Sequence, residues 1–110
     1  MKPIIPFEQF AAMDIRIGKV MSCEPVEKSE KLYRLKVDFG DEGERTILSG
    51  IQKFFTPEEL LDKQFVFIIN LEPRKMMGEE SQGMLLAAEG EEKPIPLIPQ
   101  TEAVTGTYIR

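Results

Sequence analysis

The sequence predicts an all-β protein, a small barrel of five short strands with one short helix between the third and fourth. Two observations predict this fold class. Five runs of β-branched, aromatic or alternating residues follow one another along the 110 residues, and each is too short for a typical helix. The one strong helix signal, in residues 54–63, lies between the third and fourth runs. A chain of this length has room for one core, so we expect a single domain, residues 1–110.

The N-terminal residues predict a short helix and then the first strand. In residues 1–13, Phe7 and Phe10 stand at helical spacing after a proline, so we expect this segment to dock on the body as a helical cover. In residues 14–20 isoleucines alternate with other residues until the last valine falls out of step. A β-bulge at Gly18 would restore the alternation and bend the strand, as happens when a sheet curls toward closure.

Strands two and three have clear local signals. Residues 32–39 alternate, and their apolar face includes both aromatic side chains. The opposite face carries three polar residues: Arg34, Lys36 and Asp38. Residues 40–43 begin and end with glycine and predict a hairpin turn, and residues 45–49 return as the third strand.

The helix and the last two strands complete the barrel. Thr56 is placed as the N-cap of the helix, and Glu59 three residues later forms the second half of a capping box. Residues 64–69 are apolar on both faces and predict strand four, and residues 83–88 predict strand five. A five-stranded Greek-key barrel of the oligonucleotide-binding (OB) type, spanning residues 14–88, has this order of elements. An SH3-like barrel is the competing architecture, but the position of the helix favours the OB type.

The C-terminal residues 89–110 exceed what such a barrel requires. Apolar residues woven between the prolines of this extension are typical of an extended segment packed on something. Because strand four is apolar on both faces, it needs a cover, and a second copy of the chain could provide one. We therefore expect a homodimer with contacts from the N-terminal and C-terminal extensions.

Composition argues against several kinds of site. The chain contains no histidine, so it has no imidazole base and lacks the usual nitrogen ligand of zinc. No Gly-rich phosphate-binding motif and no nucleophile elbow occurs. We therefore expect no catalytic residue, no metal site and no cofactor. The single cysteine, Cys23, and the lack of a long apolar run or signal segment predict a cytoplasmic protein without a membrane span.

The net charge of −5 is unevenly distributed. Residues 1–40 carry seven basic and six acidic side chains, whereas residues 41–110 carry seven and thirteen. A polyanionic partner must therefore bind through a local basic patch. Since the aromatic residues of strand two share its apolar face, the outer face offers few platforms on which bases could stack. The polar side chains of that face can hold phosphates.

The segment 70–82, between strands four and five, is the strongest candidate functional element. A turn marked by Pro73 and Gly78 presents Arg74 and Lys75 from two strand ends, and loops pinned on a rigid sheet often carry function. A solvated hairpin without function is the ordinary alternative for such a segment.

Several stretches together resemble one known family. They are DIRIGKV (14–20), KL (31–32), LSGI (48–51), FTPEEL (55–60) and NLEPRKMMGEESQGMLLAA (70–88). Over nearly the whole chain this set resembles the tRNA-binding domain family, which includes a stand-alone structure-specific tRNA-binding protein and the C-terminal domain or separate β subunit of methionyl-tRNA synthetases. The resemblance implies an OB-fold, generally a homodimer, that binds tRNA by shape and has no catalytic centre.

Roles in tRNA binding follow from the chemistry of the candidate side chains. Arg74 and Lys75 would pair with phosphates, and Lys31 would extend the positive track. Asn70 and Ser81 would hydrogen-bond to sugar or base edges, although a strand cap and a turn contact stay open as their roles. The complete set of predicted tRNA-binding residues is Lys31, Ser49, Asn70, Arg74, Lys75, Ser81 and Met84.

The interpretation that the sequence favours is a non-catalytic, dimeric tRNA-binding protein or the equivalent β subunit of methionyl-tRNA synthetase. A secretion-chaperone-like homodimer that binds peptides is the rival, because some relatives of this fold family are described that way. Met76, Met77 and Met84 could line an adaptable apolar groove for such peptides, although core packing is an equal alternative for Met84.

Overall fold

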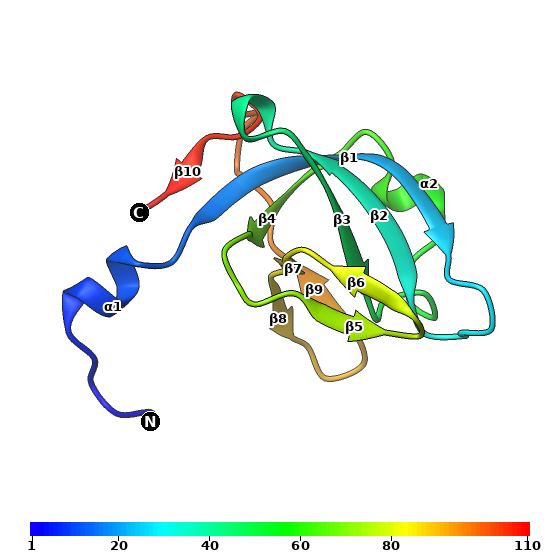
Figure 1. Ribbon diagram of the computed structural model, residues 1–110, viewed down its shortest axis with the longest axis horizontal. Helices are drawn as coiled ribbons and strands as arrows, with labels where there is room; N and C mark the ends of the chain where they lie inside the picture. The colour runs from blue at the N-terminus through cyan, green and yellow to red at the C-terminus, as the bar shows by residue number, and fades with distance from the viewer.

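The computed structural model describes residues 1–110 and shows a nearly closed antiparallel barrel (Figure 1). Residues 33–38 alternate between buried and more exposed side chains, and the buried ones line the inside of this barrel. The fold class predicted from the sequence is confirmed. In chain order the elements are α1 (Phe7–Ala11), β1 (Ile15–Pro25), β2 (Tyr33–Asp38), the 3-10 helix η1 (Gly40–Glu42), β3 (Glu44–Ser49), α2 (Pro57–Leu60), β4 (Gln64–Ile68), β5 (Arg74–Met76), β6 (Glu79–Ser81), β7 (Met84–Leu85), β8 (Ala87–Glu89), β9 (Pro94–Pro96) and β10 (Tyr108–Ile109).

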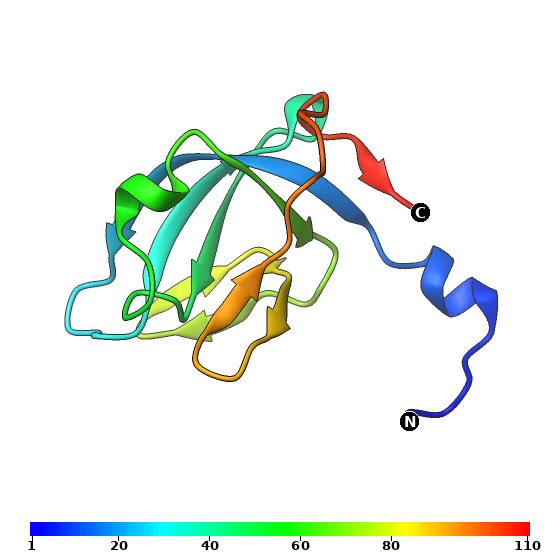
Figure 2. The same cartoon turned by 180° about the vertical axis from the view of Figure 1, so that it is seen from behind.

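Five strands form the barrel wall in the order β3-β2-β1-β4-β7. This order, with α2 between β3 and β4, is that of an OB-type barrel. The barrel closes between β3 and the chain that enters β7, where the Gln82 backbone N–H donates to the Thr46 carbonyl at 2.8 Å. Figure 2 shows the same barrel from behind, with α2 beside β1 and β2. The short β10 extends the sheet by pairing with the start of β1.

The bulge in β1 lies three residues beyond the predicted position. The register of β1 against β2 shifts between Val20 and Ser22, so the predicted bulge at Gly18 is wrong. Gly18 instead allows close packing: an added Cβ would lie 2.5 Å from side-chain atoms of both Val37 and Phe39. Glycine is therefore needed at position 18 because Val37 and Phe39 leave no space for a side chain, and not because the backbone is irregular there.

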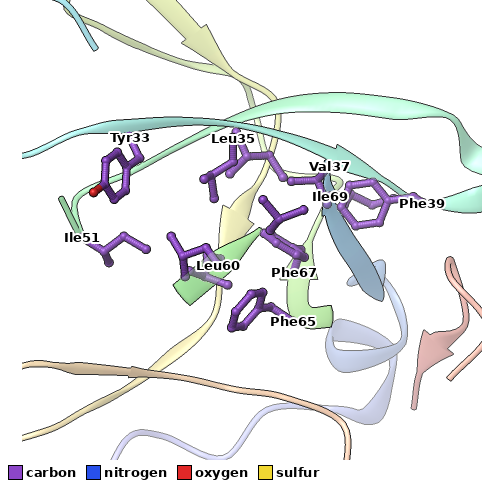
Figure 3. Close-up of a cluster of buried hydrophobic side chains, with 12 residues drawn as sticks. Tyr33, Leu35, Val37, Phe39, Ile51, Leu60, Phe65, Phe67 and Ile69 are labelled. Carbon is purple, nitrogen blue, oxygen red and sulfur yellow. The ribbon is translucent and has the colours of Figure 1, made fainter. Parts of the chain in front are cut away.

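The core is formed by the inward faces of β2 and β4 together with α2 (Figure 3). Phe39 and Phe67 meet edge to face, with ring centroids 5.4 Å apart. Leu60 of α2 is buried in the same cluster. Tyr33 places its ring in the core, and its hydroxyl donates to the Phe55 carbonyl at 2.6 Å, so its polar atom is satisfied.

The start of α2 is fixed by the predicted capping pair. The Glu59 carboxylate accepts hydrogen bonds from the Thr56 backbone N–H at 2.8 Å and from the Thr56 hydroxyl at 3.3 Å. These bonds, the first of them most, lower the pKa of Glu59. The capping box predicted from the sequence is confirmed.

The segment predicted as a polar turn contains a hairpin of its own, β5 paired with β6, which we call the β5–β6 hairpin (residues 74–81). Met77 and Gly78 form its two-residue turn and both have positive φ, 50° and 80°, as a type I′ turn requires. The single strand predicted over residues 83–88 is divided, because residues 84–85 pair with β4 whereas residues 87–89 leave the barrel to pair with β9.

The helix α1 forms where predicted, but it does not cover the barrel. No residue of α1 is buried, and Phe7 is 74% exposed. Figure 1 shows α1 projecting away from the barrel beyond the start of β1. Because its apolar side chains lie in solvent, this five-residue helix gains little stability from packing on the barrel of its own chain. Neither α-helix of the protein has the length and apolar character needed to cross a membrane.

The C-terminal extension provides a cover for β4 within the same chain. The Val66 N–H donates to the Leu97 carbonyl at 3.0 Å. Further along, the Gln64 side chain exchanges two hydrogen bonds with the Ala103 backbone, at 2.6 and 2.9 Å. Val66 and Ile68, on the outer face of β4, are both buried within the single chain, without a second copy.

Replacing Gly18 by alanine should destabilise the protein, because the new methyl group would meet Val37 and Phe39 at 2.5 Å. Overpacking of this kind costs about 1–3 kcal/mol. Gly50→Ala is a matched control, since an added Cβ at Gly50 meets nothing within 4 Å. Urea unfolding of the two variants measures the difference, and equal stabilities would contradict the close packing at Gly18.

Candidate functional site

The β5–β6 hairpin exposes two cations on an open strand edge. Arg74 and Lys75 lie on β5, which pairs only with β6, and both side chains are exposed and form no salt bridge. Neighbouring strand residues point to opposite faces, so Arg74 shares a face with Ser81 and Lys75 shares the other with Glu80. Both charges therefore flank one free edge, where a large anionic ligand can reach them from outside the barrel.

Arg34 is not free for a ligand, although its strand position suggested an outward cation. Its Nε and one terminal nitrogen each donate to a different carboxylate oxygen of Glu79 at 2.6 Å, which forms a bidentate ion pair. Glu24 adds a looser contact at 3.7 Å. The hydrogen bond from Arg34 lowers the pKa of Glu79, and the same bond raises the pKa of Arg34. The pair joins β2 to β6 across 45 residues of sequence.

The other two polar residues on the outer face of β2 differ in availability. Lys36 is exposed and forms no salt bridge. The Asp38 carboxylate accepts the Gly40 backbone N–H at 2.9 Å and so stabilises the turn into η1. Of the outward row of β2, only Lys36 therefore remains as an unpaired cation.

Ser81 is part of the barrel closure. Its side chain is buried, with 3% of the residue exposed. The hydroxyl accepts the Leu48 backbone N–H at 2.9 Å and donates to the Gly83 carbonyl at 2.9 Å. Because both functions of the hydroxyl are used inside the protein, Ser81 has no polar group to offer an RNA.

Asn70 anchors the N-terminal arm to the barrel. Its side-chain oxygen accepts the Asp14 backbone N–H at 2.8 Å, and its side-chain nitrogen donates to the Ala12 carbonyl at 2.7 Å. The Ile69 N–H also donates to the Asp14 carbonyl at 2.9 Å. The amide predicted to contact RNA therefore holds the chain between α1 and β1 against the end of β4.

Lys31 lies in the loop between β1 and β2. Figure 1 shows that this loop runs into β2 beside the tip of the hairpin, where Arg34 of β2 contacts Glu79. The loop is fixed by the Ser29 hydroxyl, which accepts the Lys31 and Leu32 N–H groups at 3.2 and 3.1 Å. The Gln52 side chain donates to the Leu32 carbonyl at 2.6 Å. The Lys31 side chain is exposed and unpaired, so the loop adds a further cation to those of the hairpin and β2.

The last two predicted residues, Ser49 and Met84, lie on strands of the barrel wall. Ser49 is half-buried at the end of β3, where it pairs in register with Tyr33. Met84 opens β7, pairs in register with Ile68 and is 40% exposed. The structure thus leaves Arg74, Lys75 and Lys31 exposed and unpaired, and it gives internal partners to Asn70 and Ser81.

Two arginines that were not predicted as site residues, Arg34 and Arg45, support the hairpin. Arg34 holds Glu79, and Arg45 donates to the carbonyls of Ile69 at 3.1 Å and Gln82 at 3.4 Å. Arg45 therefore links the two ends of the segment from which the hairpin emerges. The signal for Arg34 was its place in the alternating strand, but no local pattern indicates a partner 45 residues away.

No group of three or more His, Cys, Asp and Glu side chains is placed to hold a metal ion. Partial burial, with Glu58 and Glu24 nearby, raises the pKa of Cys23 to about 11. The Cys23 thiol is therefore protonated at neutral pH and is a weak nucleophile.

Comparison with protein families matches residues 15–108 to the family model described as a tRNA binding domain. Among curated proteins, the chain is 46% identical over 109 residues to a methionine–tRNA ligase of Methanosarcina mazei. It is 48% identical over 107 residues to a methionine–tRNA ligase of Porphyromonas gingivalis. These alignments cover 98% and 96% of this chain but only 15% and 16% of the two ligases. The chain thus spans about one sixth of the length of the curated relatives it matches.

Two solved structures superimpose on nearly the whole of this chain. A MetRS related protein from Pyrococcus horikoshii superimposes with a TM-score of 0.91 and 37% identity, covering 99% of this chain and all of that one. The chaperone CsaA of Bacillus anthracis str. Ames superimposes with a TM-score of 0.87 and 30% identity, covering 98% of this chain and all of that one.

Ser81→Ala should destabilise the barrel, because the buried Leu48 N–H would lose its acceptor. An unsatisfied buried donor costs about 1–3 kcal/mol. Ser49→Ala is the matched control, since the Ser49 hydroxyl forms no hydrogen bond and its loss should change the unfolding free energy by less than about 0.5 kcal/mol. Chemical denaturation compares the two, and a neutral Ser81→Ala would show that Ser81 does not hold the closure.

Proposed function

The chain belongs to the tRNA-binding domain family, and from this premise we propose that it is a non-catalytic module that binds tRNA through the β5–β6 hairpin and the adjoining β1–β2 loop. Arg74 and Lys75 contact phosphates at the free edge of β5, and Lys31 adds a contact from the loop. Lys36 on the outer face of β2 is a further candidate for the same positive surface.

The observation that carries this proposal is the contrast between Arg74 and the other internal arginines. Arg16 pairs with Asp14 at 2.6 Å, and Arg34 is held by Glu79. Arg45 is bonded to backbone carbonyls. Arg74 alone among these four stands exposed and unpaired, and it does so beside an unpaired lysine. An acidic protein can bind a polyanion through such a local surface, where exposed cations have no carboxylate partner.

The mode of binding follows from where the aromatic side chains lie. The exposed aromatic residues are Phe7, Phe10, Phe54 and Tyr108, and none of them lies on β2, β3 or the hairpin. A single-stranded RNA would find no stacking platform beside Arg74 and Lys75. Contacts to phosphates and 2′-hydroxyls of a folded RNA suit this surface, which supports recognition of tRNA by its shape.

Substituting both hairpin cations, Arg74→Ala with Lys75→Ala, should weaken tRNA binding by about tenfold or more at low salt. If the wild-type site neutralises about 3 to 5 phosphates, log K should fall with log[salt] at a slope of roughly −2 to −4. The double variant should make this slope shallower by about two. Filter binding of bulk tRNA over a salt series measures both quantities.

The control for that experiment is Lys19→Ala with Lys63→Ala. Both lysines line the cavity between α2 and the C-terminal extension, away from the hairpin. The control removes the same charge from another surface and should keep most of the affinity and the slope. Equal losses in the two double variants would mean that net charge, and not the hairpin, determines binding.

The partner that fits this module is a methionyl-tRNA synthetase. The matched relatives are methionine–tRNA ligases several times longer than this chain, and they align with it over 15–16% of their length. We infer that the chain works as the β subunit or as a trans-acting tRNA-binding module for a synthetase in the cytoplasm. Aminoacylation is then the work of the partner, and this chain contributes affinity for tRNA.

Homodimerisation through the extensions is part of the same proposal. The N-terminal arm exposes Ile4 and Phe7, and the C-terminal extension exposes Ile98 and Val104. Apolar side chains of this size in solvent favour an interface, and two-fold dimers are the commonest assembly. Two copies would also present two hairpins to one RNA or one complex, which raises the apparent affinity.

Sedimentation velocity should therefore find a dimer at micromolar concentration, and Ile4→Asp with Phe7→Asp should convert it to a monomer. Burying two carboxylates in an apolar contact is strongly unfavourable. Met77→Asp, at the exposed tip of the hairpin, is the control and should leave the dimer intact. A monomeric wild-type protein would overturn the dimer without affecting the hairpin.

A chaperone-like, peptide-binding role is the second candidate function. Its support is the similarity to the chaperone CsaA of Bacillus anthracis str. Ames, at 30% identity over nearly the whole chain. Met77 and Met84 are exposed and could contact apolar side chains, and the acidic surface suits basic peptides. Fluorescence titration with an unfolded basic peptide beside the tRNA titration separates the two functions.

A further inference from the structure

The ion pair between Arg34 and Glu79 lies where the tip of the hairpin meets the barrel. Two hydrogen bonds of 2.6 Å join the guanidinium to both carboxylate oxygens. Both side chains are 28–29% exposed, so the pair is partly shielded from water. This geometry orients a side chain more strictly than a single contact does, because the planar fork fixes direction as well as distance.

The rest of the hairpin has little else to hold it. Its base is anchored by Ser81, Gln82 and Arg45. Beyond the base, no other side chain in residues 72–80 forms a hydrogen bond or salt bridge to the barrel. Two strands with three paired residues each are marginal on their own in water. The position of the tip therefore depends on the Arg34–Glu79 pair.

We propose that Arg34 and Glu79 are positioning residues for tRNA binding, which hold the β5–β6 hairpin on the barrel so that the free edge of β5, flanked by Arg74 and Lys75, is presented to the RNA backbone. This inference rests on the proposed function and adds the means by which the site is held in place. The pair touches no RNA itself. By holding the hairpin in place before binding, the pair reduces the loss of conformational entropy that occurs when the two cations engage phosphates.

Glu79 makes the inference testable, because two accounts of this residue predict opposite signs. If Glu79 were an ordinary surface acid, Glu79→Gln would remove a negative charge next to the site and tighten tRNA binding. If Glu79 positions the hairpin, the same substitution should weaken binding in spite of the more favourable charge. We expect a loss of about threefold to tenfold at fixed salt, the range of coupling for residues in direct contact.

Glu80→Gln is the matched control. Glu80 is the next residue of β6, is exposed, faces away from Arg34 and forms no salt bridge. The substitution Glu80→Gln removes the same charge from the same strand without breaking an ion pair, so tRNA binding should be unchanged or tighter. The exchanged pair, Arg34→Glu with Glu79→Arg, keeps the net charge of the protein and should recover affinity relative to Glu79→Gln.

Hydrogen exchange without RNA provides an independent readout. In Glu79→Gln the amides of residues 74–81 should exchange several times faster than in the wild type, while the amides of β2 and β4 stay protected. Unchanged exchange, or tRNA binding as tight as in Glu80→Gln, would overturn the inference. These outcomes leave the proposed function standing as long as Arg74→Ala with Lys75→Ala still loses affinity. If that double variant binds tRNA like the wild type, the proposed function fails, and the inference fails with it.

Discussion

Closure of the barrel between β3 and residues 81–82 is the constraint on which the rest of the structure depends. Side chains take part as well as the backbone: the Ser81 hydroxyl accepts the Leu48 N–H, and the Gln82 side-chain oxygen accepts the Thr46 N–H. Arg45 adds contacts to the chain on both sides of the hairpin. Because closure occurs at the base of the hairpin, the cations of β5 are carried outward while the segment keeps a fixed origin on the barrel.

The distribution of ion pairs explains how an acidic chain can offer a basic surface. Arg16 and Arg34 are each bound to two carboxylates, and these contacts hold the C-terminal residues and the hairpin against the barrel. The carboxylates engaged in this way contribute little repulsion toward a phosphate. The cations without a carboxylate partner include Arg74 and Lys75 of the hairpin and Lys31 of the β1–β2 loop, and all three are exposed to a polyanion.

The sequence correctly predicted those elements whose formation depends on residues close together in the chain. The alternation of β2, the capping box of α2 and the position of this helix in the strand order all follow from neighbouring residues. Strands β5 and β6 within segment 70–82 were not predicted as separate elements, because each is only three residues long. The internal roles of Asn70 and Ser81 depend on partners far away in sequence, which periodicity cannot identify. The bulge was misplaced because glycine serves both irregular backbone and close packing, and only the neighbours of Gly18 distinguish them.

The central claim, that folded RNA is bound by the β5–β6 hairpin and the adjoining loop, is tested most directly by following backbone amide NMR signals during titration with tRNA. The account predicts that the largest changes fall on residues 74–81 and around Lys31, and that the cavity between α2 and the C-terminal extension is unaffected. Changes confined to that cavity, or no changes in any signal over the whole titration, would contradict it.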